Sequence, residues 1–83
     1  AFVLDVREQV EWDEYHIPHT TLIPLGELPS RLSELDKNRQ IVVVCRSGNR
    51  SQEGRDILLQ AGFNATSMSG GVQEWREADY PIE

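Results

Sequence analysis

The segment 41–63, "IVVVCRSGNRSQEGRDILLQAGF", decides the fold of this chain. Its first four residues are an apolar run of β-branched side chains, which is typical of a strand buried on both faces. The run delivers Cys45, the only cysteine of the chain, into a short loop. Residues 52–61 then read as a helix, with Ser51 as its expected N-cap and Gly62 as a left-handed C-terminal residue. The segment therefore predicts a strand, a tight loop and a helix.

The rest of the chain repeats this alternation. Leu28, Leu32 and Leu35 lie at i, i+4 and i+7, which predicts an amphipathic helix within 26–37 with Pro29 in its first turn. The other expected strands are 2–6, a brief one in "TTLI" (20–23) and 65–68, and the other expected helices are 8–15 and 72–78, the last stopped by Pro81. This order predicts an α/β fold, with a mostly parallel β-sheet flanked by helices on both faces.

The bulk composition limits the function. The 83 residues suffice for one small domain, and the net charge of −6 argues against a nucleic-acid or membrane-surface binder. No apolar run is long enough to span a membrane. The chain does not begin with Met, so we expect a processed protein or one domain of a longer one. We expect a cytoplasmic protein, with a periplasmic one as the alternative because the N-terminus could be processed.

Three polar junctions follow the expected strands: "DVRE" (5–8), "CRSGNRS" (45–51) and "SGGV" (69–72). In a parallel sheet these junctions share the edge where ligands bind. The backbone N–H groups of the middle junction and the helix that follows it favour negative charge, which should lower the pKa of the Cys45 thiol. One cysteine cannot form an internal disulfide, and a lone cysteine after a Val-rich strand is most often an inert buried residue. The residues that follow Cys45 favour a reactive thiolate instead.

The loop around this thiol suits a small anion. Gly48 gives the backbone freedom to curl, while Arg46 and Arg50 offer planar guanidinium groups to an oxyanion. The expected site is listed by role: Cys45 as the catalytic residue; Arg46, Ser47, Gly48, Asn49 and Arg50 for substrate binding; Asp5, Arg7 and Ser51 as supporting residues. Gly70 and Gly71 are interpreted first as a turn, and second as a close backbone approach to the pocket.

"CRSGNRS" after "IVVVC" resembles the active loop of the rhodanese family. "LDVRE" (4–8), "HIP…IPL" (16–25), "AGF" (61–63) and "SGGVQEW" (69–75) resemble further landmarks of that family in the same order. The resemblance implies persulfide chemistry, in which the Cys45 thiolate takes a sulfane sulfur from a small anionic donor such as thiosulfate. It passes the sulfur to cyanide or to a small or protein thiol, as a thiosulfate:cyanide sulfurtransferase does. No cofactor and no metal are expected.

The resemblance is incomplete at the N-terminus. Family members usually carry another strand and helix before the segment that corresponds to "LDVRE". The expected organisation is therefore a single rhodanese-like domain over 1–83 that lacks this pair or was cut from a longer chain. Tyr15, His19 and Thr20 replace residues that the family often has as Gly, Gly and Ala, and Gly54 stands inside a helix where Ala is more usual.

Four alternatives remain open from the sequence. The domain could be the sulfur carrier of a larger protein, or a non-enzymatic interaction module, although such modules typically lose the cysteine. A phosphatase or arsenate reductase of this fold would need five residues between the cysteine and the arginine, whereas four separate Cys45 from Arg50. A Cys–His hydrolase would need His16 or His19 beside the thiol. "HIPH" (16–19) has too few ligands for a metal site.

Overall fold

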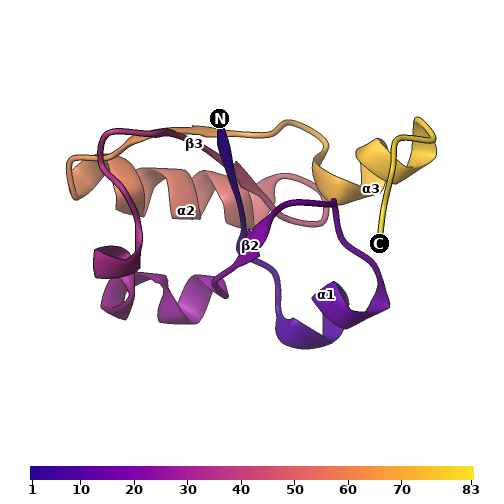
Figure 1. Ribbon diagram of the computed structural model, residues 1–83, viewed down its shortest axis with the longest axis horizontal. Coiled ribbons are helices and arrows are strands. Elements are labelled where there is room, and N and C mark those ends of the chain that lie inside the picture. The colour runs from indigo at the N-terminus through magenta and orange to yellow at the C-terminus, as the bar shows by residue number, and fades with distance from the viewer.

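The computed structural model describes residues 1–83 and has a four-stranded sheet as its centre (Figure 1). The strands are β1 (Phe2–Asp5), β2 (Thr21–Leu22), β3 (Gln40–Val44) and β4 (Asn64–Ser67). The helices are α1 (Gln9–Glu14), α2 (Asn49–Gln60) and α3 (Gly71–Glu77), and two 3-10 segments, η1 (Leu25–Ser30) and η2 (Leu32–Glu34), connect β2 to β3. None of these helices has the length and apolar character needed to cross a membrane.

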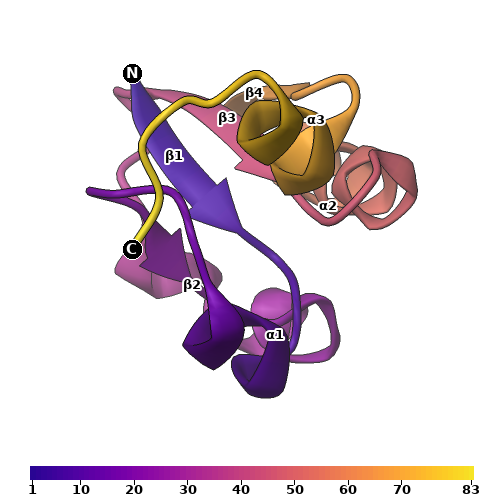
Figure 2. The ribbon, with the colours of Figure 1, turned by 90° about the vertical axis from the view of Figure 1, so that its right-hand side faces the viewer.

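All strand pairs in the sheet are parallel, in the order β2-β1-β3-β4 (Figure 2). The register pairs Asp5 at the end of β1 with Val44 at the end of β3. The segments that follow these two strands therefore leave the sheet at the same edge. The expected α/β class and parallel sheet are confirmed, and they bring the junction after β1 beside the loop that contains the cysteine.

Alternation along the strands divides the apolar residues between two cores. One face of β3 contributes Ile41 and Val43 to the larger core, against the face covered by α2 and the 3-10 segments. Val44 points to the other face and packs in a smaller core with Val72 of α3. Because Cys45 follows Val44, it falls back on the α2 side and closes the end of the larger core.

The prediction of an amphipathic α-helix within 26–37 is wrong about the type of helix that forms. The leucines do face the core: Leu28 is fully buried and Leu32 packs against the same cluster. The backbone instead forms the two short 3-10 segments η1 and η2. Pro29 lies inside η1 without an N–H to donate, and Arg31 between the segments has φ −120° and ψ 16°, which ends the helical path.

The expected cap of α2 is also wrong, whereas its end is as expected. The N-cap is Gly48, in the left-handed region with φ 115°, and Ser51 lies inside the first turn. The curl of the loop already has helical geometry from Asn49 onward, so no separate cap is needed before residue 52. At the other end, Gly62 is left-handed with φ 90°, and the N–H of Phe63 donates to the Leu58 carbonyl at 2.9 Å.

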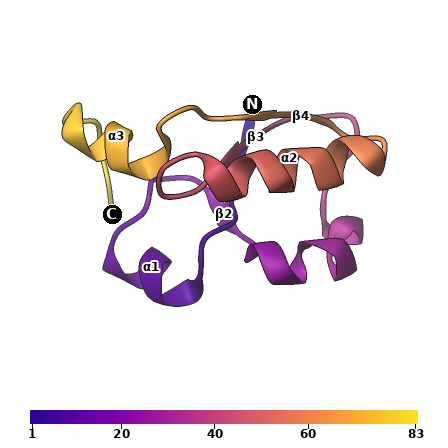
Figure 3. The same ribbon diagram turned by 180° about the vertical axis from the view of Figure 1, so that it is seen from behind.

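The tail after α3 returns to the region of α1. Glu83 and His16 exchange two backbone hydrogen bonds, of 2.9 and 2.7 Å, and the Trp75 indole donates to the Pro81 carbonyl at 2.7 Å. Figure 1 and the rear view in Figure 3 both show α1 and α3 at one end of the molecule, with the 3-10 segments at the other. The loop between β3 and α2 lies beside α3 in both views.

Candidate active site

The loop between β3 and α2 places the thiol under a cover of backbone. Cys45 is only 1% exposed, and its Sγ accepts the N–H of Gly48 at 3.0 Å. Gly48 can direct this N–H inward because its φ of 115° turns the chain in a way that side chains disfavour. The sulfur therefore lies at the bottom of a curl of backbone that leads into the first turn of α2.

The surroundings of the sulfur favour the thiolate. Burial raises the pKa of the Cys45 thiol, but the Ser51 hydroxyl and the N–H groups of Ser51, Gly48 and Ser47 outweigh it, so the pKa lies below its ordinary value. The predicted direction of the shift is confirmed. Its causes are the hydrogen-bond donors of the loop and of the first turn of α2.

Ser51 supports the loop from inside the protein. Its hydroxyl is fully buried, donates to the Gly48 carbonyl at 3.0 Å and lies 2.6 Å from the Ser67 hydroxyl of β4. A hydroxyl has a single proton, so donation to a thiolate and donation to Gly48 exclude each other. The neighbouring Ser67 hydroxyl gives Ser51 a second partner, which leaves its proton free to turn toward the sulfur when the sulfur is charged.

An ion pair holds the loop from the α1 side. The Arg50 guanidinium donates to both carboxylate oxygens of Glu11, at 2.6 and 2.8 Å. The hydrogen bonds from Arg50 lower the pKa of Glu11 to about 2, against a smaller opposing effect of burial. The pKa of Arg50 is raised in turn, first by Glu11. Arg50 is therefore engaged with the protein itself, across 39 positions of sequence.

A second, fully buried pair braces the end of β1. Arg7 and Asp5 are 2% and 0% exposed, and the Arg7 side chain contacts both carboxylate oxygens of Asp5 at 2.8 to 3.0 Å. The Arg7 backbone N–H also donates to Asp5, at 2.9 Å. One terminal nitrogen of the Arg7 guanidinium also donates to the Tyr15 carbonyl, at 2.9 Å. Asp5 and Arg7 thus connect the end of β1 to the end of α1.

The backbone of α3 holds the loop from the other side. The N–H of Val72 donates to the Cys45 carbonyl at 2.8 Å, and that of Gln73 donates to the Arg46 carbonyl at 2.9 Å. Gly71, with φ 60°, lies so close that a Cβ on it would overlap the carbonyl oxygens of Cys45 and Arg46. Gly71 is therefore a close backbone approach to the loop as well as part of a turn.

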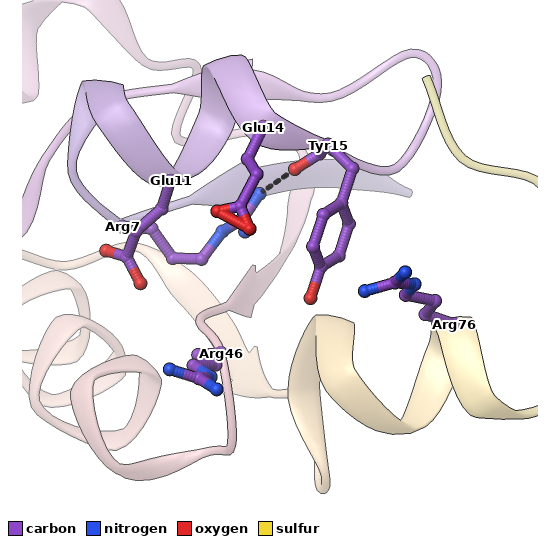
Figure 4. Close-up of a pocket in the computed structure, with 6 residues that line it drawn as sticks. All are labelled: Arg7, Glu11, Glu14, Tyr15, Arg46 and Arg76. Carbon is purple, nitrogen blue, oxygen red and sulfur yellow. Dashed lines mark hydrogen bonds between the residues drawn. The ribbon is translucent and has the colours of Figure 1, made fainter.

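Arg46 differs from Arg50 in having no protein partner. Its side chain is exposed and forms no hydrogen bond or ion pair with the protein. It lines a pocket of about 140 Å³ between the loop, α1 and α3, together with Arg7, Glu11, Glu14, Tyr15 and Arg76 (Figure 4). Cys45 does not line this pocket, so the pocket adjoins the loop through the residue that follows the cysteine.

The other residues predicted for substrate binding lie on the opposite flank of the loop. Ser47, Gly48 and Asn49 border a polar pocket of about 260 Å³, together with Gln52, Arg55, Ser67, Ser69 and Gly70. Cys45 does not line this pocket either. The loop therefore separates two open spaces, a charged one on the side of α1 and a nearly uncharged one on the side of β4.

The histidines lie apart from the thiol. His16 stacks on Trp12 with ring centroids 3.7 Å apart, its Nδ1 lies 3.0 Å from the Trp12 carbonyl, and its Nε2 lies 3.4 Å from Glu83. Neither His16 nor His19 hydrogen-bonds to Cys45, which removes the basis for a Cys–His hydrolase. No three His, Cys, Asp or Glu side chains are grouped so that they could hold a metal ion.

Sequence reasoning missed four residues of the charged pocket: Glu11, Glu14, Tyr15 and Arg76. A signal for the first three was present, because α1 follows β1 directly and the end of β1 was expected at the same edge as the loop. Side chains three and four positions apart on such a helix face the same way. Arg76 had no comparable signal, since its place depends on how α3 packs.

Comparisons with known proteins agree on one family. Residues 1–78 match the family described as rhodanese-like domain. The chain is 35% identical over 80 residues to the putative sulfurtransferase YtwF of Bacillus subtilis, covering 96% of this chain and 78% of that protein. It is 38% identical over 74 residues to the putative sulfur carrier protein YrkF of the same organism, covering 88% of this chain and 40% of that protein. The crystal structure of a rhodanese-related protein from Thermoplasma volcanium has a TM-score of 0.94 at 36% identity, covering 99% of this chain and 82% of that one.

Proposed function

Because this chain belongs to the family of rhodanese-like domains, we propose that Cys45 carries a sulfane sulfur, as a persulfide, from a small anionic donor such as thiosulfate to a thiol or to cyanide. Sulfurtransferase and sulfur-carrier relatives support sulfur transfer as the reaction. One observation carries the proposal furthest: the only thiol of the chain is buried at a helix start, where hydrogen-bond donors lower its pKa. This arrangement suits a nucleophile that works as a thiolate.

In the first step, the Cys45 thiolate attacks the sulfane sulfur of thiosulfate. A bond forms between Sγ and that sulfur, the S–S bond of thiosulfate breaks, and sulfite leaves with the electron pair. No proton has to be moved to the leaving group, so a general base beside the thiol is not required. The N–H groups of the loop, which converge on Sγ in the free protein, then stabilise the negative terminal sulfur of the persulfide.

In the second step, an acceptor removes this sulfur. A thiolate attacks the outer sulfur of the persulfide, the bond between that sulfur and Sγ breaks, and Cys45 leaves as a thiolate. The acceptor thiol becomes a persulfide, and cyanide becomes thiocyanate by the same displacement. Cys45 is a good leaving group because a lowered pKa makes its thiolate more stable.

The two arginines of the loop take different roles in this proposal. Arg46 is exposed and unpaired, so it receives the anionic donor against the mean field of a protein with a net charge of −6. Arg50 is a positioning residue, because both terminal nitrogens of its guanidinium donate to Glu11. Ser47, Gly48 and Asn49 supply the backbone of the curl, and Asp5, Arg7 and Ser51 support it.

Intact mass spectrometry tests the proposal directly. Incubation with thiosulfate should add the mass of one sulfur to the protein, and a reductant should remove it. Peptide mapping should place the addition on Cys45, and Cys45→Ser should gain no mass and transfer no sulfur to cyanide. A Cys45→Ser protein that forms thiocyanate as fast as the parent would refute the assignment.

A sulfur-carrier role within a larger protein is the second candidate, supported by the 38% identity to the putative sulfur carrier YrkF. It keeps the persulfide on Cys45 and changes the acceptor from a small molecule to a protein thiol. Transfer rates to small thiols and to a thiol-containing protein partner, compared after loading with sulfur, separate the two roles. The phosphatase alternative is weakened because Arg50, which would have to bind phosphate, is engaged with Glu11.

A further inference from the structure

The charged pocket beside the loop contains charges that the protein does not neutralise. We propose that this pocket binds the ammonium and carboxylate groups of an amino-acid thiol, with cysteine as the simplest member, and so selects the acceptor. This inference rests on the proposed function, because it names the class of molecule that removes the sulfur from Cys45. Glu14 binds the ammonium group, and Arg76 binds the carboxylate together with Arg46.

Two of the charged residues that line the pocket are already satisfied. Arg7 is paired with Asp5 and bound to the Tyr15 carbonyl, and Glu11 is paired with Arg50. These residues form the back wall of the pocket and are held by the protein. A ligand therefore does not need to compensate them, and their charges contribute little net attraction.

The other three charged residues have no partner of opposite charge in the protein. Glu14, Arg46 and Arg76 are exposed and take part in no ion pair or hydrogen bond. Figure 4 shows the Glu14 carboxylate directed from α1 into the pocket, with Arg46 and Arg76 approaching from the loop and from α3. Three elements distant in sequence thus present two positive groups and one negative group to one small space.

The Tyr15 ring fixes one of the positive groups. The guanidinium carbon of Arg76 lies 4.7 Å from the centre of this ring, and that of Arg7 lies 5.6 Å from it. Stacking on an aromatic face restrains a side chain that would otherwise be free in solvent. Arg76 is therefore already placed at the pocket before a ligand arrives, which lowers the entropy cost of binding.

The pattern of free charges selects a zwitterion over simpler ions. A dianion that occupied the whole pocket would be attracted by Arg46 and Arg76 but repelled by Glu14, so the proposed donor contacts Arg46 alone; a plain cation would meet the opposite conflict. A molecule with one ammonium and one carboxylate on adjacent atoms satisfies both signs. A pocket of about 140 Å³ is suited to a ligand the size of an amino acid.

The position of Arg46 connects this pocket to the chemistry. Arg46 follows Cys45 directly, and its carbonyl is held by α3. An amino acid anchored between Glu14 and Arg76 has its side chain free to reach the rim of the loop, where the outer sulfur of a persulfide would stand. The backbone of the ligand is then bound away from the sulfur, and its thiol is the only part that reacts.

Single-turnover transfer from the sulfur-loaded protein tests this assignment. The acceptors are cysteine, cysteamine (no carboxylate), 3-mercaptopropionate (no ammonium) and 2-mercaptoethanol (neither). For each acceptor the rate of the variant is divided by that of the parent, which cancels the intrinsic reactivity of the thiol. We expect Arg76→Gln to lower this ratio about fivefold for the two carboxylate-bearing acceptors relative to the other two.

Glu14→Gln should have a complementary effect. We expect its ratio to fall about threefold for cysteine and cysteamine, which carry an ammonium group, and to rise for 3-mercaptopropionate. Arg39→Gln and Glu53→Gln are matched controls, because each removes the same charge from an exposed side chain outside the pocket. Equal ratios for all four acceptors in both pocket variants would overturn the inference while leaving the persulfide proposal intact.

A binding measurement tests the amino-acid site independently of the proposed persulfide chemistry. S-methylcysteine has the same ammonium and carboxylate groups but cannot accept sulfur. Its titration should shift the backbone amide resonances of Tyr15 and Arg76 in the parent, and about fivefold more ligand should be needed in Arg76→Gln. Absence of these shifts in the parent overturns the inference, whether or not Cys45 forms a persulfide.

Discussion

The two sides of the Cys45 loop are held by different kinds of interaction. On the α1 side, charged side chains do the holding, through Arg50 with Glu11 and through the buried pair of Arg7 with Asp5. On the α3 side, two backbone N–H groups bind the carbonyls of Cys45 and Arg46, and no side chain is involved. The contacts on the α1 side therefore depend on which charged residues are present and on the pH. Those on the α3 side depend mainly on whether the backbone of α3 can come close to the loop.

Because of this difference, substitutions on the two sides of the loop should have different effects. On the α1 side, only the unpaired side chains, Glu14 and Arg46, can be exchanged to change the charge of the pocket without loosening the contacts that hold the loop. The α3 side determines where the carbonyl of Cys45 lies, and hence where the curl of backbone begins. Substitutions of the paired residues on the α1 side and of Gly71 on the α3 side should accordingly lower stability, whereas substitutions of the unpaired charged residues should change electrostatics alone.

The largest effect is expected from Asp5→Asn on the charged side. It leaves the Arg7 guanidinium, which is 2% exposed, without a compensating charge. Loss of one member of a buried pair costs about 3–5 kcal/mol of unfolding free energy. Urea unfolding of the variant and the parent measures this loss. A cost below about 1 kcal/mol would mean that solvent reaches the pair and that this side does not depend on a buried charge.

Gly71→Ala should be next in size, and it tests the backbone side. The added Cβ overlaps the loop carbonyls and must also adopt a φ of 60°, so we expect a loss of about 2–3 kcal/mol and slower persulfide formation. Gly26→Ala is the matched control, because nothing lies within 4 Å of a Cβ there. If both alanine variants unfold at the same urea concentration, the close approach of α3 does not determine the position of the loop.

Glu11→Gln should have a smaller effect that depends on pH. The pKa of Glu11 lies at about 2 in the folded protein, below the ordinary 4.5, so its pairing with Arg50 stabilises the fold above about pH 4.5. This contribution is lost as the pH falls from 4.5 to 2. Because the pair is partly exposed, we expect no more than about 1 kcal/mol.

Unfolding of Glu11→Gln and of the parent should therefore be compared at pH 6 and near pH 2. The difference between the two proteins should be present at pH 6 and clearly smaller near pH 2, where about half of the Glu11 carboxyl in the folded parent is protonated. A constant difference at both values would show that the variant disturbs α1 by something other than the ion pair.

Arg46→Gln should have the smallest effect on stability. With an exposed side chain and no partner, its removal should change the unfolding free energy by less than about 0.5 kcal/mol. The KM for thiosulfate should rise, and the rise should shrink in high salt because the interaction is electrostatic. Arg50→Gln is the comparison, since it should lose stability as Glu11→Gln does. Equal kinetics for Arg46→Gln and the parent would exclude Arg46 as the donor site.

The sequence was sufficient for the sheet and for the loop because both depend on local patterns. The run of β-branched residues before Cys45 and the glycine within the loop determine the strand and the curl. The segment 26–37 was misread because leucine spacing reveals which face is buried and not which hydrogen bonds form. Pro29 suits the first turn of an α-helix as well as a 3-10 segment, so it did not separate the two.

Local sequence patterns could not predict which residues contact the loop. Arg46 and Arg50 look equivalent in the sequence, and only the position of Glu11, 39 residues away, distinguishes them. Gly71 is interpreted from the sequence first as a turn residue and second as a close backbone approach to the pocket, but its closeness to the Cys45 carbonyl depends on the packing of α3. Contacts between distant segments require the assembled tertiary structure.

The burial of Cys45 bears on how readily its sulfur is oxidised. A thiolate of lowered pKa is ordinarily the first group that peroxide converts to sulfenic and then to irreversible sulfinic acid. Here the Cys45 residue is 1% exposed beneath the loop, so an oxidant must reach the sulfur of the resting protein by the same restricted path as the sulfur donor. In the proposed cycle, loading extends the side chain by about 2 Å, the length of an S–S bond, and brings the transferable atom toward the surface. In the proposed cycle the outer sulfur covers Sγ, so that an oxidant meets first an atom that the next turnover replaces.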